Sequence, residues 1–414
     1  MHALTASRRL LFLLPFPPRA DAAHGGSRVM AGLIGELAAR HRVGLLYLQA
    51  SEDAPLDDDL VRKCTYVEAV PRPEVDANAG TRRSYRLRLW SSLLAGKPAW
   101  AVQWDVPAFG RRLQEVARIV RPDVVQAEFH VMGQYFDAVP RDRAVRVLVE
   151  HEPGSPAARE RLRAGRGGGR VLPYADYLAW QRYERATMRR ADAVVTFTER
   201  DRTALLTSAG RTPVVVIPLG TTLPKQPLEA EGSEPGSVLF FGNFMHPPNV
   251  DAARRLTEEI FPRIVARHSG ATLYLVGDRA PTGLGSSTTG SIIVTGRVPD
   301  VQPYLDRAAL VVVPMRLGGG MRVKVLEALA AGKAVVATRL AVEGLGLIDG
   351  EQVVLAETDE DIAAAAAALL EDPRRRAALA RAARAWACEH LGWDRPAAVY
   401  EELYTGLIRA RSRE

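Results

Sequence analysis

Short apolar runs alternate with amphipathic segments along the first half of the chain. The runs are rich in Leu and Val, which is typical of buried strands, while the amphipathic segments repeat apolar positions at helical spacing. The pattern predicts strands over residues 9–14, 43–48, 65–70, 123–127, 145–149, 193–197 and 214–217. It predicts helices over residues 27–40, 85–94, 106–120, 174–190 and 201–208. This alternation favours a parallel sheet with helices on both faces.

A second series of the same kind follows a break. Residues 218–236 are rich in Pro, Gly and acidic residues and lack apolar periodicity, so they are the best linker candidate. Beyond them the pattern predicts strands over residues 237–241, 271–276, 292–295, 310–313 and 334–337. Helices are predicted over residues 249–267, 321–331, 359–370, 374–388 and 396–408. The chain therefore predicts two doubly wound α/β domains, with ligands at the carboxyl ends of the strands.

The most informative stretch covers residues 310–340, LVVVPMRLGGGMRVKVLEALAAGKAVVATRL. A buried strand ends at Pro314, three glycines follow, and an amphipathic helix begins. Glycines let the backbone approach phosphate oxygens, and first-turn N–H groups lack intrahelical partners. Arg322 and Lys324 add two cations, which predicts a diphosphate site. Glu327, one turn after Lys324, could accept from ribose hydroxyls. The alternative is a solvated helix start after a flexible loop.

Residues 314–338 resemble the nucleotide-sugar signature of retaining GT-B glycosyltransferases of family 4, also called glycosyl transferases group 1. That signature carries two glutamates eight residues apart. The second aligns with Glu327, but the first would fall on Gly319, so one glutamate is replaced. The resemblance implies a metal-independent enzyme that needs no cofactor. It also implies a nucleotide-sugar site formed by Gly319, Gly320, Met321, Arg322, Lys324 and Glu327.

Two further motifs extend the resemblance over residues 237–400. In VLFFGNFMHPPNVDAARRL, the resemblance implies that Gly242 and Asn243 lie at the phosphates, and Asn249 is predicted to cap the next helix. Family members often place Arg and Lys in this loop, whereas this sequence has neither between residues 242 and 250. In VTGRVPD, the resemblance implies that Arg297 and Val298 contact the base, largely through backbone groups.

The resemblance is looser over residues 1–218. Gly25 and Gly26 precede a helix, where the family faces the donor phosphates. The family has a histidine near the donor sugar at the end of the strand in PDVVQAEFH, and either Glu128 or His130 takes that position. His151 in VLVEHEPG matches another family histidine. These three residues are the catalytic candidates, and the alternative for each histidine is an ordinary core or surface role.

The resemblance also implies a domain plan. Residues 1–218 would form an acceptor-binding Rossmann-like domain, residues 219–236 a linker, and residues 237–393 a nucleotide-sugar-binding Rossmann-like domain. Residues 394–414 would form a helix that crosses back to the N-terminal domain. The predicted fold is α/β GT-B, with the two domains facing each other across a cleft.

Charge and composition limit the classes of molecule that this protein is expected to bind. The formal net charge is +7, and residues 1–218 carry 33 Lys and Arg against 24 Asp and Glu. This excess indicates an anionic acceptor or an acidic membrane face, or an arginine-rich composition with solvated side chains. No nucleic-acid-binding signature is present. No run of eighteen apolar residues occurs, and residues 9–14 favour a first strand over a signal peptide. Two distant cysteines indicate a reducing cytoplasm, with peripheral contact at the inner membrane face as an option.

The sequence therefore predicts a glycosyltransferase of the hexosyltransferase type, acting in bacterial glycan or natural-product glycosylation. Its donor would be a UDP-, GDP- or dTDP-sugar, and its acceptor a glycan, a lipid-linked molecule or a small molecule, with no nucleic-acid partner. Retention of anomeric configuration is implied by the resemblance alone. Three alternatives stay open: a nucleotide-sugar epimerase of the same fold, a non-catalytic nucleotide-sugar-binding subunit, and a membrane-surface scaffold.

Overall fold

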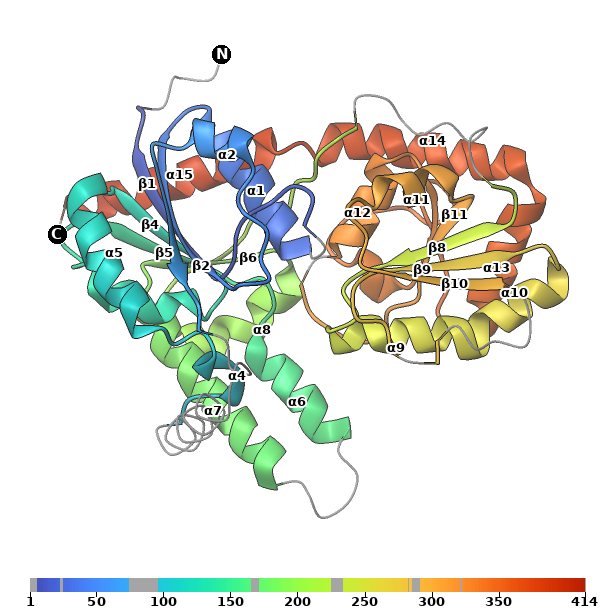
Figure 1. Cartoon of the computed structure of the whole chain (residues 1–414), viewed down its shortest axis with the longest axis horizontal. Helices are drawn as coiled ribbons and strands as arrows, with labels where there is room; N and C mark the ends of the chain where they lie inside the picture. The colour runs from blue at the N-terminus through green and yellow to red at the C-terminus, as the bar shows by residue number, and fades with distance from the viewer. Residues whose placement is uncertain are drawn as a thin grey trace. The chain divides into compact units, whose positions relative to one another are not determined.

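The computed structural model describes residues 6–22, 25–73, 96–164, 171–224, 234–281, 283–284, 291–320 and 322–413. The chain gathers into two compact units (Figure 1). The first comprises Met1–Arg19, Leu33–Pro218 and Ala397–Glu414, and the second comprises Ala20–Gly32 and Leu219–Pro396. Met321, the predicted helix over residues 85–94 and residues 225–233 of the predicted linker lie outside the described residues.

Seven described strands of the first unit form one parallel sheet in the order β3-β2-β1-β4-β5-β6-β7. Their bounds are β1 Arg9–Leu14, β2 Arg42–Gln49, β3 Tyr66–Pro71, β4 Val124–Glu128, β5 Val145–Val149, β6 Ala193–Thr196 and β7 Val214–Val216. The central strands are buried on both faces, so β1 reads as an unbroken apolar run, whereas β4 and β5 also bury the polar side chains of Gln126, Glu128 and Arg146. All seven lie where the alternation predicted strands.

Helices of the first unit supply the rest of its core. They are α1 Gly25–Ala38, α2 Asp58–Lys63, α4 Ala99–Val102, α5 Pro107–Val120, the 3₁₀ turn η1 Met132–Ala138, α6 Gly154–Ala164, α7 Val171–Met188 and α8 Glu199–Ala209. On one face of the sheet, Leu11 and Leu13 of β1 belong to the same buried cluster as Phe109 of α5 and Phe136 of η1. The residues of α1 up to Gly32 group with the second unit.

The last helix, α15 Asp394–Arg411, joins the first unit from Ala397 onward. Its Glu401 carboxylate is 2.9 Å from Nε2 of the buried His41. Its Tyr404 hydroxyl donates to Oε1 of Gln126 on β4 at 2.5 Å. These contacts tie the end of the described chain to the middle of the first sheet.

The second unit repeats the plan with six described strands in the order β10-β9-β8-β11-β12-β13. They are β8 Ser237–Phe241, β9 Thr272–Val276, β10 Ser291–Gly296, β11 Leu310–Val313, β12 Ala334–Ala337 and β13 Val354–Leu355. The helices are α9 Pro247–Arg255, the π turn η3 Leu256–Ile260, α10 Phe261–Arg267, α11 Gln302–Arg307, α12 Val323–Ala330, the 3₁₀ turn η4 Arg339–Val342, α13 Asp359–Glu371 and α14 Pro373–His390. Figure 1 shows α9 and α10 on one side of the sheet and α12 and α14 on the other.

The second unit departs from two local predictions, and one of them, the N-cap at Asn249, is wrong. The predicted helix over residues 249–267 begins earlier, at Pro247, and a π turn divides it at Leu256–Ile260. Pro262 lacks an N–H group, so the regular hydrogen-bond ladder cannot run through it. Asn249 is not the N-cap, because two prolines suit the first helical positions and His246 precedes them. In the first unit the pattern missed α6, whose sequence GSPAARERLRA has too few large apolar residues to mark a helical face.

Candidate functional site

Arg322 closes the glycine loop that follows β11. Its Nη1 donates to the carbonyl oxygens of Gly319 and Gly320, and its Nη2 donates to that of Gly318 at 2.7 Å. Gly318 and Gly320 have φ values of +101° and +69°, which residues with a side chain rarely adopt. The sequence predicted Arg322 as a phosphate cation. In the structure, its N–H groups hold the shape of the loop that leads into α12.

Lys324 lies in the first turn of α12 and is 8% exposed. Its Nζ donates to Oδ1 of Asn249 at 2.6 Å and lies 4.2 Å from the centre of the Phe240 ring. The same amide is fixed from its other end, because Nδ2 donates to the carbonyl of Asn243 at 2.7 Å. A Cβ atom on Gly242 would lie 2.9 Å from Nζ, so glycine leaves room for the ammonium.

The electrostatic state of Lys324 is unusual for a lysine. Burial lowers its pKa from 10.5 to about 7; Arg322 and Arg28 lower it as well, while Glu327 opposes them. Among the described residues, no carboxylate forms an ion pair with this ammonium. A buried ammonium that lacks a counter-ion is costly, and a bound anion would relieve that cost.

Glu327 lies one turn further along α12 and is gripped by Arg28, also of the second unit. Nε and Nη2 of Arg28 donate to the two carboxylate oxygens at 2.5 and 2.9 Å. Arg28 also donates to the carbonyl of Ala22. A carboxylate has about four lone-pair sites, so Glu327 can still accept from a ligand hydroxyl while Arg28 holds it.

The start of α12 therefore carries a concentration of positive charge. Arg28, Arg322 and Glu327 are the charged groups that act on the Lys324 ammonium, and only Glu327 of these described residues is acidic. The N–H groups of the helix N-terminus add a partial positive charge. Gly25 lies directly against this turn, because a Cβ there would come within 2.9 Å of Val323 Cβ. The arrangement can hold an anion of two or more charges.

The remaining predicted nucleotide-sugar residues are Gly26, Asn243, Arg297 and Val298. Gly26 lies in the first turn of α1. The Asn243 side chain accepts from the N–H of Met245 at 2.9 Å. Arg297 is exposed and Val298 half-buried, just past Gly296, whose φ of +70° ends β10.

In the first unit, Glu128 and His151 form a buried pair where β4 and β5 end. Oε2 of Glu128 is 2.7 Å from Nε2 of His151, and Oε1 accepts from Gln126 at 2.6 Å. The His151 ring stacks on Phe129, with centroids 3.8 Å apart. Phe129 has a φ of +65°, a strained value for an aromatic residue. Such strain at the carboxyl end of a strand is common at functional sites.

His130 makes a second pair of the same kind. Its Nδ1 is 2.9 Å from Oε2 of Glu150, and both residues are buried. Burial disfavours the charged imidazole and is the largest single effect, but Glu150, Glu184 and Glu152 together raise the pKa of His130. Glu184 of α7 accepts from the N–H of Ser155, and burial raises the pKa of Glu184 to about 7. Glu128 and His130 thus face different partners at the end of β5.

Sequence reasoning missed three residues of these sites: Arg28, Glu150 as a partner, and Asn249 as the lysine's acceptor. Arg28 follows the predicted glycine pair, but no local pattern indicates a partner 299 positions away. Glu150 follows the end of β5, next to the predicted His151, and this position at a strand end was a usable signal for a site residue.

Within the described ranges, no group of three or more His, Cys, Asp or Glu could hold a metal ion. None of the described helices is long and apolar enough to cross a bilayer.

The family match lies in the second unit. Residues 235–372 match the model of the family described as glycosyl transferases group 1. The second unit contains a glycosyl transferases group 1 domain. This domain holds β8 to α13, and so carries Lys324, Glu327 and the glycine loop.

One curated relative matches part of the chain. It is an uncharacterized 44.6 kDa protein in the cps region of Klebsiella pneumoniae, 26% identical over 133 residues. The alignment spans 30% of this chain and 34% of the length of that protein.

Solved structures match nearly the whole chain, glycosyl transferases group 1 domain included. Sucrose-phosphate synthase from Thermosynechococcus elongatus gives a TM-score of 0.70 at 17% identity, covering 97% of this chain and 100% of that one. WaaG, a glycosyltransferase involved in lipopolysaccharide biosynthesis, gives a TM-score of 0.64 at 15% identity, and the match covers 96% of this chain and 100% of that one. HepE of Anabaena, in complex with UDP and glucose, gives 0.62 at 16%, covering 96% and 99%. The predicted GT-B fold of two Rossmann-like doubly wound domains is confirmed.

Proposed function

We propose that this protein is a retaining glycosyltransferase that moves a sugar from a nucleoside-diphosphate sugar to an acceptor hydroxyl. The observation that carries the proposal is the buried Lys324 at the start of α12, whose ammonium has no carboxylate partner among the described residues. A diphosphate would compensate that charge. The glycosyl transferases group 1 domain over the same residues supports the assignment.

Each residue of the cluster has a distinct role in this proposal. Lys324 and the first N–H groups of α12 bind the diphosphate. Glu327 accepts from the ribose hydroxyls and Arg28 fixes its orientation. Arg322 keeps the glycine loop in the shape that the phosphates need. Charge grows on the leaving diphosphate as the glycosidic bond breaks, so these groups stabilise the transition state more than the bound donor.

The catalytic candidates in the first unit fit a positioning and polarising role. Glu128 and His151 share a hydrogen bond, so the carboxylate fixes the imidazole ring. Glu150 and the nearby carboxylates raise the pKa of His130, which favours the protonated form of this imidazole. Retention would follow from acceptor attack on the face that the diphosphate leaves, without a protein nucleophile.

The donor and acceptor are proposed by class. HepE of Anabaena is described in complexes with UDP and with UDP-glucose, which makes a uridine nucleotide the first donor to test. TarM is described in complex with UDP and α-GlcNAc-glycerol. By analogy we propose a glycan, lipid-linked or small hydroxyl-bearing acceptor for this chain. Arg297 and Val298 would then contact the base.

A non-catalytic nucleotide-sugar-binding subunit is the second candidate, and Gly319 favours it. Glycine stands where the signature has its first glutamate, so position 319 has no side chain to contact the donor sugar. The two candidates share donor binding and differ in turnover.

A two-stage experiment tests the proposal. Thermal shifts with UDP, GDP, ADP and dTDP and their sugars should identify one stabilising nucleotide. Release of that nucleotide from its sugar, with the anomer of the product read by NMR, then measures turnover and retention. We expect an α-linked donor to give an α-linked product. Binding without turnover for every acceptor class would favour the subunit, and an inverted anomer would exclude retention.

A further inference from the structure

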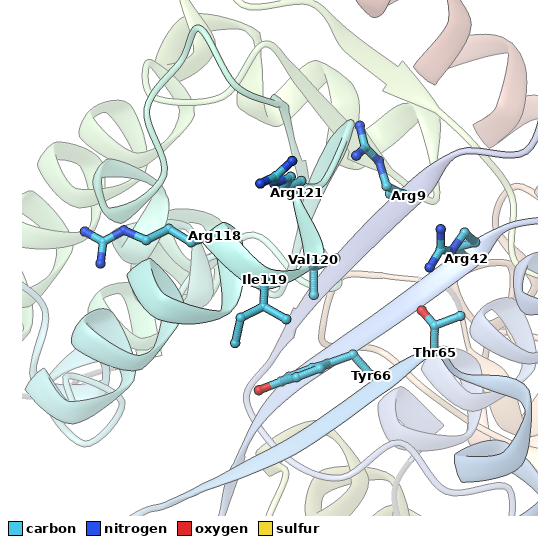
Figure 2. Close-up of a pocket in the computed structure, with 8 residues that line it drawn as sticks. All are labelled: Arg9, Arg42, Thr65, Tyr66, Arg118, Ile119, Val120 and Arg121. Atoms are coloured by element: carbon cyan, nitrogen blue, oxygen red, sulfur yellow. The ribbon is translucent and has the colours of Figure 1, made fainter.

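A pocket of about 390 Å³ lies in the first unit at the amino ends of its strands. Four arginines line it: Arg9, Arg42, Arg118 and Arg121. The other lining residues are Thr65, Tyr66, Ile119 and Val120. Arg9, Arg42 and Tyr66 are the first residues of β1, β2 and β3. Arg118, Ile119 and Val120 form the end of α5, and Arg121 follows it. Figure 2 shows Tyr66 and Arg42 on the strand side, and Ile119 and Val120 on the helix side with Arg118 extending outward.

The pocket is distinct from the sites described above. Glu128 and His151 lie where β4 and β5 end, whereas this pocket lies where the strands begin. A five-residue strand spans about 17 Å at about 3.3 Å per residue, so the two sites are at opposite edges of the sheet. A molecule bound here would not occupy the catalytic edge.

Charge is the pocket's main property. Arg9 is neutralised by Asp123, whose carboxylate it grips with Nη2 at 2.6 Å. Among the described residues, Arg42, Arg118 and Arg121 form no ion pair, and no carboxylate lines the pocket. The C-terminus of α5 offsets about half a charge, which leaves an excess of more than about two.

Ordinary structural roles account for part of this set only. Cations near a helix C-terminus are favourable, which explains Arg118. Arg121 follows α5 with a φ of +48°, a position that glycine normally takes. Arg42 starts a strand and has neither reason to be there. The walls also include Ile119, which is 62% exposed, and the ring of Tyr66.

We propose that this pocket binds a phosphate-bearing molecule. The guanidinium groups of Arg42 and Arg121 hold the phosphate, because the planar fork of N–H donors matches phosphate oxygens, while Arg118, which extends outward in Figure 2, adds positive charge at the rim. Ile119 and Tyr66 contact the organic part of the molecule. The same chemistry is offered by a soluble phosphate ester and by a lipid headgroup, and the experiment separates the two sources.

Inorganic pyrophosphate, titrated by calorimetry, is the first probe. It is added to the Lys324→Met variant, so that the proposed donor site does not contribute. The test variant adds Arg42→Gln and Arg121→Gly, and glycine relieves the backbone strain at residue 121 and protects folding. Arg111→Gln, on the exposed side of α5, is the matched control. The second probe is co-sedimentation with phosphatidylglycerol vesicles, against phosphatidylcholine.

We expect the double change to weaken pyrophosphate binding at least about tenfold, with the control unchanged and the melting temperature kept. Binding to phosphatidylglycerol vesicles alone, lost in the same variant, assigns the phosphate to a lipid headgroup. Equal binding in the double variant, or no binding to either probe, overturns the proposal. Because donor affinity is measured separately at Lys324, failure here leaves the proposed function standing.

Discussion

Donor affinity should fall as pH rises above about 7.5, because Lys324 must gain a proton to bind a diphosphate. Its pKa is about 7, so at pH 8 about a tenth of the free protein carries the ammonium. A bound diphosphate would return the pKa toward 10.5. Binding at pH 8 would then take up about 0.9 proton, and each further pH unit would cost about 1.4 kcal/mol.

The assay is calorimetric binding of the matched nucleotide sugar between about pH 7.5 and 9.0, where the lysine titrates. Nucleotide sugars lack the ionisation that complicates free diphosphates near neutrality. The dissociation constant should rise roughly 25-fold over this range. Titrations in two buffers of different ionisation enthalpy should report the proton uptake directly.

Lys324→Met removes the titrating group, so it should weaken binding at about pH 7.5 and abolish the pH dependence. It should also stabilise the folded protein at about pH 6 by about 3–5 kcal/mol, because a pKa lowered by about 3.5 units marks a destabilising buried charge. Lys333→Met is the matched control: burial lowers the pKa of Lys333 to about 8, but its ammonium donates to the carbonyls of Asp306 and Ala308. Affinity that is flat with pH in the wild type, or wild-type affinity in Lys324→Met, would refute the reasoning.

Three further outcomes are expected. Arg322→Lys should restore little of the turnover lost in Arg322→Ala, because one ammonium cannot replace the N–H groups that hold three loop carbonyls; full rescue in steady-state kinetics would contradict this. Arg28→Ala should weaken donor binding less than Glu327→Ala, which loses about 1–3 kcal/mol, and calorimetry on both gives the order. Stability should fall by about 3 kcal/mol between about pH 4.5 and 7, because Glu184 (pKa about 7) keeps a proton that the unfolded chain has lost; Glu184→Gln should flatten that part of a denaturation series, and an unchanged slope would count against it.

Much of the architecture could be read from the sequence for a simple physical reason. Parallel strands buried on both faces require continuous apolar runs, and residues 9–14 and 310–313 have them. The predicted helix over residues 321–331 likewise lies close to α12, which begins at Val323 after the glycine loop. Short elements such as β13 carry too few apolar positions to produce a period.

The chemistry of the site was less predictable. Local spacing placed Lys324 on α12 but could not show its burial, which depends on Phe240 and on Asn249, 75 positions away. Asn249 looked like a helix cap because asparagine favours that position, yet Pro247 starts the helix first. The ion pair between Arg28 and Glu327 joins residues that are 299 positions apart, and sequence spacing cannot predict such a pair.

The most direct test of the central claim is equilibrium binding of nucleotide sugars to the wild-type protein and to Glu327→Ala. We predict that one nucleotide class binds saturably to the wild type. We predict that Glu327→Ala, with an unchanged circular-dichroism spectrum, binds it about 5- to 150-fold more weakly, the equivalent of a lost charged hydrogen bond. Saturable binding to neither protein, or the same affinity in both, would contradict the assignment of α12 and its glycine loop as the donor site.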